Sequence, residues 1–205
     1  GFPGNLELTV RYTLTDENAL VLDYTATTDA PTIINLTNHS YFNLEGQSSG
    51  SMLEQTLCLN ASTFTEGNAE TCPTGRILPV AGTPMDFTRA KPIGRDIQAE
   101  YSQLQMCGGY DHNFILDKEP GMLALAAVAR SEKTGITMET YTTQPGVQLY
   151  TSNSLQNDTR PGKTGGIYGR YQGFCLETQH YPCTPSHPEF PSVELRPGEE
   201  YHETT

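Results

Sequence analysis

The sequence predicts an all-β fold, an antiparallel β-sandwich, formed by a single domain over residues 1–205. Its 19 glycines and 14 prolines divide the chain into short segments. Several of these segments alternate apolar and polar residues, which is the pattern of a strand with one buried face. With 36% hydrophobic and 18% charged residues, the composition is that of a globular protein rich in turns.

The first part of the chain predicts a β-hairpin. Residues 6–14 alternate without a break, and residues 20–26 continue the pattern after the polar turn Asp16-Glu17-Asn18. We therefore expect residues 6–28 to pair as two antiparallel strands. Residues 32–44 begin as a β-branched strand, but they end in amides, a histidine and two aromatic residues, which is unusual for a solvent-facing strand.

The remaining strands follow from the same alternation. Residues 53–64 alternate again, whereas residues 73–94 hold so many prolines and glycines that we expect loops there. One short helix is expected between Asp96 and Gln105. Further strands are predicted at residues 122–130, 136–142, 147–151 and 173–177.

Charge and cysteine content restrict the partners and the compartment. The 12 basic and 24 acidic residues give a formal net charge of -12, which disfavours nucleic acid and anionic membranes as partners. A neutral small molecule fits this charge better. No apolar run reaches the roughly 18 residues of a membrane span. The five cysteines are odd in number and lack CxxC spacing, which predicts reduced thiols and a cytoplasmic protein.

Two residues are candidates for proton transfer. His39 lies between Asn38 and Ser40 in a segment otherwise suited to burial. It is either a hydrogen-bonded core histidine or a catalytic group. Glu177 ends an apolar strand, where partial desolvation raises a carboxyl pKa and suits it to accept a proton near neutral pH. The alternative is an ordinary carboxylate that faces water at a strand end.

Two more polar clusters, at residues 108–114 and 142–148, are either binding segments or simple turns. In the first, two glycines permit close backbone approach beside Asp111. In the second, Pro145 biases Gln144 towards an extended conformation. No phosphate-binding glycine loop and no GxSxG elbow occurs. His180, Cys183 and His187 are interrupted by prolines and lack a fourth ligand, so we expect no metal site.

Six segments of the chain together match one known pattern in order. They are residues 35–44, 74–87, 109–114, 141–150, 173–179 and 195–201. Taken together they resemble the aldose 1-epimerase (galactose mutarotase) family, and the resemblance extends from residue 1 to residue 205. It implies a sandwich of the galactose mutarotase type and an isomerase that interconverts the α and β anomers of free hexoses such as galactose and glucose.

The resemblance also implies roles for individual residues. His39 matches the general acid of the family and Glu177 its general base, while Asp111 and Gln144 match residues that bind the sugar. No cofactor and no metal is implied. This chemistry suits the residue types, because each group must act as both acid and base when the ring opens and recloses, and His and a tuned Glu can do so near neutral pH.

The chain also departs from the family pattern. Family members carry an Asn-Arg pair and a His-Gly-Gly segment in a long N-terminal section, and they continue past the final residues seen here. We therefore expect a C-terminal portion, incomplete at the N-terminus and in the last strand. Such a portion would have low activity by itself. It would also expose sheet edges, which permit self-association.

Other functions stay open at this point. The same fold could serve as a non-catalytic carbohydrate-binding module, or the chain could be an inactive fragment. A sugar-phosphate epimerase would need basic residues around its pocket, and none lies within the four polar clusters. A structural protein without a pocket is disfavoured, because burying those polar clusters costs free energy that no function would require.

Overall fold

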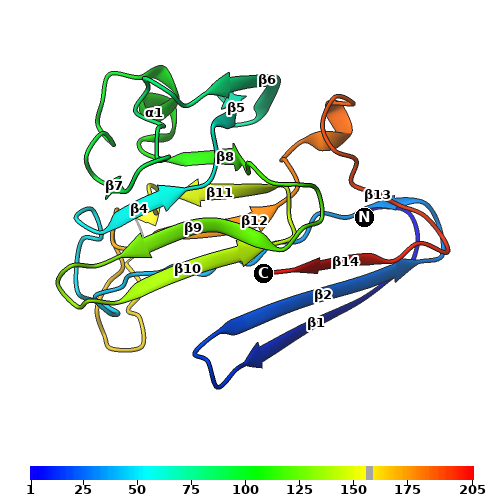
Figure 1. Ribbon diagram of the computed structural model, residues 1–205, viewed down its shortest axis with the longest axis horizontal. Helices are drawn as coiled ribbons and strands as arrows, with labels where there is room; N and C mark the ends of the chain where they lie inside the picture. Colours follow the sequence, from blue (N-terminus) through cyan, green and yellow to red (C-terminus); the bar gives the residue numbers. More distant parts are fainter. Residues whose placement is uncertain (156–158) are drawn as a thin grey trace.

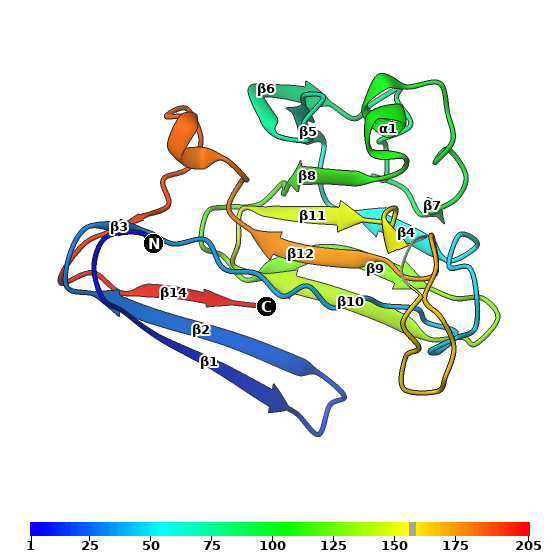
Figure 2. The same cartoon turned by 180° about the vertical axis from the view of Figure 1, so that it is seen from behind.

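The chain folds as packed antiparallel sheets (Figures 1 and 2). The computed structural model describes residues 1–155 and 159–205. The sheet that matters most for function has the strand order β12-β11-β8-β5-β6. Its strands are β5 (Thr63–Gly67), β6 (Pro73–Pro79), β8 (Asp111–Ile115), β11 (Gly146–Tyr150) and β12 (Cys175–Gln179).

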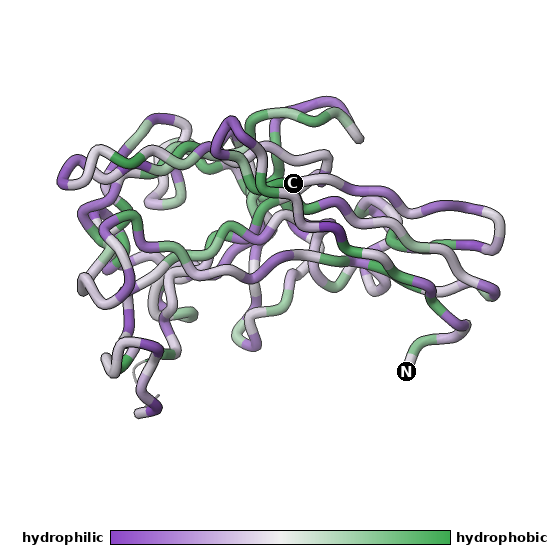
Figure 3. Tube along the Cα trace, turned by 90° about the horizontal axis from the view of Figure 1, so that it is seen from below, coloured by the Kyte–Doolittle hydropathy of each residue, from purple (hydrophilic) through white to green (hydrophobic). Residues whose placement is uncertain are grey.

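A second sheet, in the order β10-β9-β4-β7, packs against the first and completes the sandwich. Its strands are β4 (Thr56–Leu59), β7 (Lys91–Pro92), β9 (Ala124–Arg130) and β10 (Thr137–Thr142). Leu57 and Leu59 of this sheet share one buried core with Phe64, Phe114 and Leu149 of the first. Figure 3 shows the alternation of hydrophobic and hydrophilic residues along the strands that makes this possible. The predicted all-β sandwich is therefore confirmed.

A smaller sheet, β1-β2-β14, and the pair β3–β13 form a separate apolar cluster. The strands are β1 (Leu6–Leu14), β2 (Leu20–Thr28), β3 (Thr32–Ile33), β13 (Glu194–Leu195) and β14 (Tyr201–Thr204). The register of β1 and β2 runs unbroken from Leu6↔Thr28 to Leu14↔Leu20, which confirms the predicted hairpin. The inward residues of β2 are buried, whereas the apolar residues of β1 are largely exposed.

Some predicted boundaries were wrong, and proline and glycine explain two of them. Residues 73–79 form β6 rather than a loop, because β6 is an edge strand and a proline there sacrifices no ladder hydrogen bond. Residues 53–64 contain β4 and the start of β5 rather than one strand. The expected helix is α1 (Ser102–Cys107), which ends at Gly108 in the left-handed conformation.

Two helical segments complete the described elements: α1 and the short 3₁₀ turn η2 (Thr184–Ser186). Among the residues that the structure describes, no helix has the length and apolar character needed to cross a bilayer.

Candidate active site

The candidate site lies on the polar face of the β12-β11-β8 part of the first sheet. Alternate residues of a strand face opposite sides of its sheet. Phe114, Val147 and Leu176 therefore point into the core. The register aligns two rows of side chains on the other face, Asn113–Gln148–Glu177 and Asp111–Tyr150–Cys175.

The segment after β3 crosses this polar face and carries His39. Near one end, the Asn35 side chain exchanges hydrogen bonds of 2.9 and 3.0 Å with the backbone of His180, just beyond β12. Near the other end, Phe42 and Phe174 exchange backbone hydrogen bonds of 2.8 and 2.9 Å just before β12. Because the segment is anchored beyond both ends of β12, His39 is held over the middle of that strand.

His39 and Glu177 meet at this point. Nε2 of His39 lies 3.3 Å from Oε1 of Glu177, and the His39 side chain is 49% exposed while that of Glu177 is 11% exposed. Burial raises the pKa of the Glu177 carboxyl; the His39 charge opposes this shift and Asp111 adds to it. The arrangement places an accessible imidazole beside a shielded carboxyl of raised pKa, which suits proton transfer to a ligand.

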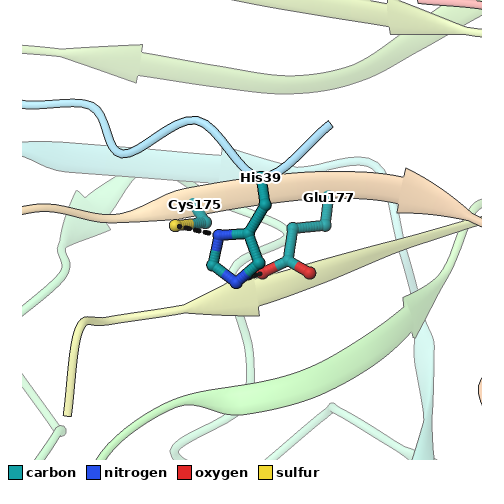
Figure 4. Close-up of side chains that lie close together, drawn as sticks. All are labelled: His39, Cys175 and Glu177. Carbon is teal, nitrogen blue, oxygen red and sulfur yellow. Dashed lines mark hydrogen bonds and ion pairs between the residues drawn. The ribbon is translucent and has the colours of Figure 1, made fainter. Parts of the chain in front are cut away.

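Cys175 contacts the other nitrogen of the same imidazole. Its Sγ lies 3.4 Å from Nδ1 of His39, so the ring sits between the thiol and the Glu177 carboxylate (Figure 4). Cys175 is fully buried, and its burial, followed by the charges of Glu177 and Asp111, raises the pKa of its thiol strongly. The thiol therefore stays protonated at neutral pH and can donate to Nδ1.

Asp111 and Gln148 form the next part of the polar face. Nε2 of Gln148 donates a hydrogen bond of 2.7 Å to Oδ1 of Asp111. Burial raises the pKa of Asp111, while the Gln148 hydrogen bond and the His39 charge lower it in part. Both residues line a cavity of about 20 Å³ together with Asn113, which is room for about one water molecule. Among the described residues, Oε1 of Gln148 and both polar side-chain atoms of Asn113 have no hydrogen-bond partner.

Two tyrosines flank the imidazole. The ring of Tyr41 stacks on that of His39 at a centroid distance of 5.1 Å, and Tyr150 approaches it edge-on at 6.0 Å. Burial raises the pKa of Tyr41 to about 12, so its hydroxyl stays neutral. These rings provide an apolar wall beside the polar groups, as is common in small-molecule sites.

Comparison with known proteins identifies the family. The family model described as Aldose 1-epimerase matches residues 1–205. The chain belongs to the aldose 1-epimerase family. Galactose mutarotase of Sus scrofa is 42% identical over 205 residues, and the match covers 100% of this chain and 58% of that protein. Aldose 1-epimerase of Escherichia coli (strain K12) is 38% identical over 207 residues, covering 100% of this chain and 59% of that protein.

Solved structures of the aldose 1-epimerase family share the fold of this chain. The GalM/aldose epimerase homologue from C. elegans superposes with a TM-score of 0.86 at 33% identity, covering 100% of this chain and 59% of that one. Galactose 1-epimerase from Lactobacillus acidophilus NCFM gives a TM-score of 0.81 at 30% identity, covering 99% of this chain and 56% of that one. The predicted galactose mutarotase type of sandwich is thereby confirmed.

Gln144, which the family resemblance suggested as a sugar contact, is committed to protein partners in this structure. Its Nε2 donates to the Leu36 carbonyl at 3.3 Å and lies 3.0 Å from the Tyr201 hydroxyl, and its Oε1 lies 2.8 Å from Nδ1 of His180. The side chain is buried, and Gln144 lies two residues before β11. Its role in binding a sugar stays a prediction.

Gln148 was missed by the sequence reasoning, although a signal for it existed. Val147 and Leu149 are the apolar residues of β11, so the alternation turns Gln148 and Tyr150 towards the opposite face. Glu177 lies on that same face, directly across from Gln148. Four residues beyond Gln144 in the same motif, Gln148 is the one whose amide meets Asp111.

One group in the described residues brings metal-binding atom types together: His39, Cys175 and Glu177, whose ligand atoms lie within 4.8 Å of one another. The thiol approaches Nδ1 and the carboxylate approaches Nε2. The thiol and the carboxylate therefore contact different nitrogens of the ring and form a hydrogen-bonded chain through the imidazole. A metal ion bound by all three side chains would instead need the thiol and the carboxylate beside the same ring nitrogen.

Proposed function

We propose that this aldose 1-epimerase family chain carries the proton-transfer groups for interconverting the α and β anomers of a free aldose such as galactose or glucose. The observation that carries the proposal is the contact of 3.3 Å between the His39 imidazole and the Glu177 carboxyl on the polar face of β12. Asp111 and Gln148 beside them offer charge-assisted and amide hydrogen bonds to sugar hydroxyls.

In the proposed reaction, the Glu177 carboxylate takes the proton of the anomeric hydroxyl, and Nε2–H of His39 gives a proton to the ring oxygen. The C1–O5 bond breaks with its electron pair on O5, and C1 becomes an aldehyde carbon. Rotation about C1–C2 turns the other face of the carbonyl towards O5. The ring then recloses with His39 as base and Glu177 as acid, which restores both groups.

Cys175 supports this assignment of roles. A protonated thiol that donates to Nδ1 leaves that nitrogen without a proton, so the neutral imidazole carries its proton on Nε2. Nε2 is the nitrogen that faces Glu177 and the open side of the site. The thiol therefore holds the ring in the tautomer that the first step of the proposed reaction requires.

We infer that residues 1–205 form a single partial domain that contains the proton-transfer groups. The chain matches 58% of the length of the porcine relative, so we expect slow turnover from residues 1–205 alone. All five cysteines are free thiols in the structure, which supports a reducing compartment such as the cytoplasm.

The proposal is tested by the change Glu177→Gln in the longest expressible protein that contains residues 1–205. Loss of the base should lower kcat for galactose mutarotation by about 10²–10⁴-fold, since this is the usual contribution of a positioned acid–base group. Polarimetry of freshly dissolved α-galactose measures the rate, and calorimetry measures sugar binding, which should change little.

Glu54→Gln is the matched control, because Glu54 is exposed and lies outside the site. It should leave both the rate and the binding unchanged. If Glu177→Gln kept the wild-type rate, Glu177 would not be the base. If it abolished sugar binding together with turnover, the carboxyl would instead be a binding group.

A further inference from the structure

Two thiols outside the proposed catalytic site lie close together, on two loops that contact each other. Cys72 belongs to the turn between β5 and β6, and Cys183 belongs to the loop that follows β12. Burial and then the neighbouring Cys72 thiol raise the pKa of the Cys183 thiol, and Sγ of Cys72 lies 3.8 Å from the carbonyl oxygen of Glu70. Cys183 is exposed and Cys72 is half-buried, so solvent reaches the pair.

The backbone around each cysteine is fixed by local hydrogen bonds. The Cys72 amide donates to Oδ1 of Asn68 at 3.0 Å, and the Asn68 amide donates to the Cys72 carbonyl at 2.8 Å. The Ser186 amide donates to the Cys183 carbonyl at 2.9 Å, and Pro182 restricts the chain just before Cys183. Neither loop needs to refold to hold its thiol where it is.

The two loops are also joined to each other beside the thiols. Nε2 of His187 lies 3.0 Å from the Pro73 carbonyl oxygen, which accepts a hydrogen bond from it. The backbone at Gly75 also lies close to this loop, because a Cβ there would be 2.8 Å from Nδ1 of His187 and 2.5 Å from Oε1 of Glu189. The two loops are therefore in contact at more than one residue beside the thiols.

This contact forms the rim of the cavity that contains Asp111 and Gln148. Thr71 and Pro73, which flank Cys72, line that cavity, and so does Pro182, which precedes Cys183. A covalent bond between the two sulfur atoms would fix both walls of the cavity relative to each other.

We propose that Cys72 and Cys183 form a reversible disulfide at this rim by exchange with a low-molecular-weight disulfide. The exposed Cys183 thiolate attacks one sulfur of the small disulfide, which forms a mixed disulfide and releases one small thiol. The Cys72 thiolate then attacks the Cys183 sulfur, the mixed disulfide breaks, and the second small thiol leaves. The protein loses two electrons and two protons, and the small disulfide gains them as two thiols.

The exchange should accelerate as pH rises. Burial, followed by the neighbouring Cys72 thiol, raises the pKa of the Cys183 thiol. The thiolate is the nucleophile, so its fraction at neutral pH is small and grows as the pH approaches the raised pKa.

The experiment is incubation of the purified chain of 205 residues with glutathione disulfide, followed by acid quenching, alkylation and peptide mapping. The thiol titre of the unfolded protein should fall from the five free cysteines to three, with Cys72 and Cys183 in one linked species. Dithiothreitol should restore all five.

Serine variants separate this pair from the other thiols. Cys72→Ser should stop at a mixed disulfide on Cys183, and Cys183→Ser should keep its remaining thiols. Cys107→Ser is the matched control, since Cys107 is half-buried like Cys72 but contacts His112 instead. It should still form the Cys72–Cys183 link. A wild-type chain that ends as a mixed disulfide on Cys183, or that links any other pair, would overturn the proposal.

Discussion

Glu177 couples the chemistry of the site to the stability of the fold. Its carboxyl has a pKa raised above the ordinary value of 4.5, mainly by burial. The folded chain therefore binds more protons than the unfolded chain between the ordinary and the raised pKa values. The contribution of Glu177 to the free energy of unfolding is therefore greatest below pH 4.5. It falls as the pH rises from 4.5 through the raised pKa of the folded chain.

Glu177→Gln should therefore stabilise the chain at neutral pH, because the amide removes a buried charge. Well below pH 4.5 the wild-type carboxyl is protonated in both states, so the two proteins should have similar free energies of unfolding. Urea denaturation at neutral and acid pH measures the difference. A gain of about 1 kcal/mol would raise Tm by about 2–4 °C. The exposed Glu54→Gln should show no such pH-dependent gain, and an equal gain in both variants would contradict the explanation.

Replacing Cys175 should change the tautomer of the His39 imidazole, although Cys175 itself would not contact the sugar. In Cys175→Ala, Nδ1 of His39 loses its donor, so the ring should populate both tautomers and kcat should fall about tenfold, the value of one hydrogen bond. Nitrogen NMR of the labelled imidazole measures the tautomer ratio directly. Cys175→Ser keeps a donor and should restore it.

Cys107→Ala is the control for the Cys175 experiment, because Cys107 makes a similar thiol contact of 3.9 Å with a different histidine, His112. It should leave the His39 nitrogen signals unchanged. A wild-type His39 with its proton on Nδ1 would show that the thiol accepts rather than donates, and the positioning role would be wrong.

At the scale of elements, the start of β8 depends on Gly109. The Thr151 and Asn153 side chains bind the Tyr110 backbone with hydrogen bonds of 2.9 to 3.2 Å, and this network sets the position of Asp111. Gly109 has a φ of +143°, and a Cβ there would lie 2.3 Å from Oδ1 of Asn153. Sequence reasoning anticipated close backbone approach at this glycine pair.

Gly109→Ala should therefore destabilise the fold by about 1–3 kcal/mol, since it adds both backbone strain and a collision with a buried network. Gly173→Ala is the matched control, because its Cβ would meet neighbours at an ordinary 3.4 Å and its φ is not positive. Thermal denaturation of both variants measures the difference. Equal Tm values would mean that the network around Asn153 adjusts freely.

Local patterns reveal some elements and cannot reveal others. The β1–β2 hairpin was predictable because both strands and their turn are adjacent in sequence. The contact of Cys175 with His39 was not predictable from spacing, since it arises where a distant segment crosses β12. Gln148 is an intermediate case. Alternation along the strand predicts which face of the sheet it occupies, but its contact with Asp111 can be predicted only if the pairing of β8 with β11 is known.

At the scale of the whole molecule, the hairpin leaves part of the fold uncovered. The inward face of β2 is buried with Tyr201 of β14 and Leu195 of β13. On β1 the same face continues but is open: Leu8 is 44% exposed and Leu14 is 80% exposed. Because β1 ends the order β1-β2-β14, its outer edge is unpaired within the described residues. An open apolar face next to a free edge favours association.

The predicted self-association through this strand can be tested with charges on its two faces. Leu8→Lys places a charge on the apolar face and should weaken association at least about tenfold, or about 1.4 kcal/mol. Thr9→Lys places the same charge on the opposite face of β1 and should weaken it less. Sedimentation velocity over a range of protein concentrations measures both.

The dependence of association on salt concentration is a second test of the same contact. The net charge of -12 repels copies of the chain from one another, so higher ionic strength should strengthen association. Equal weakening by Leu8→Lys and Thr9→Lys would assign the contact to the strand edge rather than to the apolar face. A wild-type chain that stays monomeric at every concentration and salt level would show that the exposed leucines do not associate.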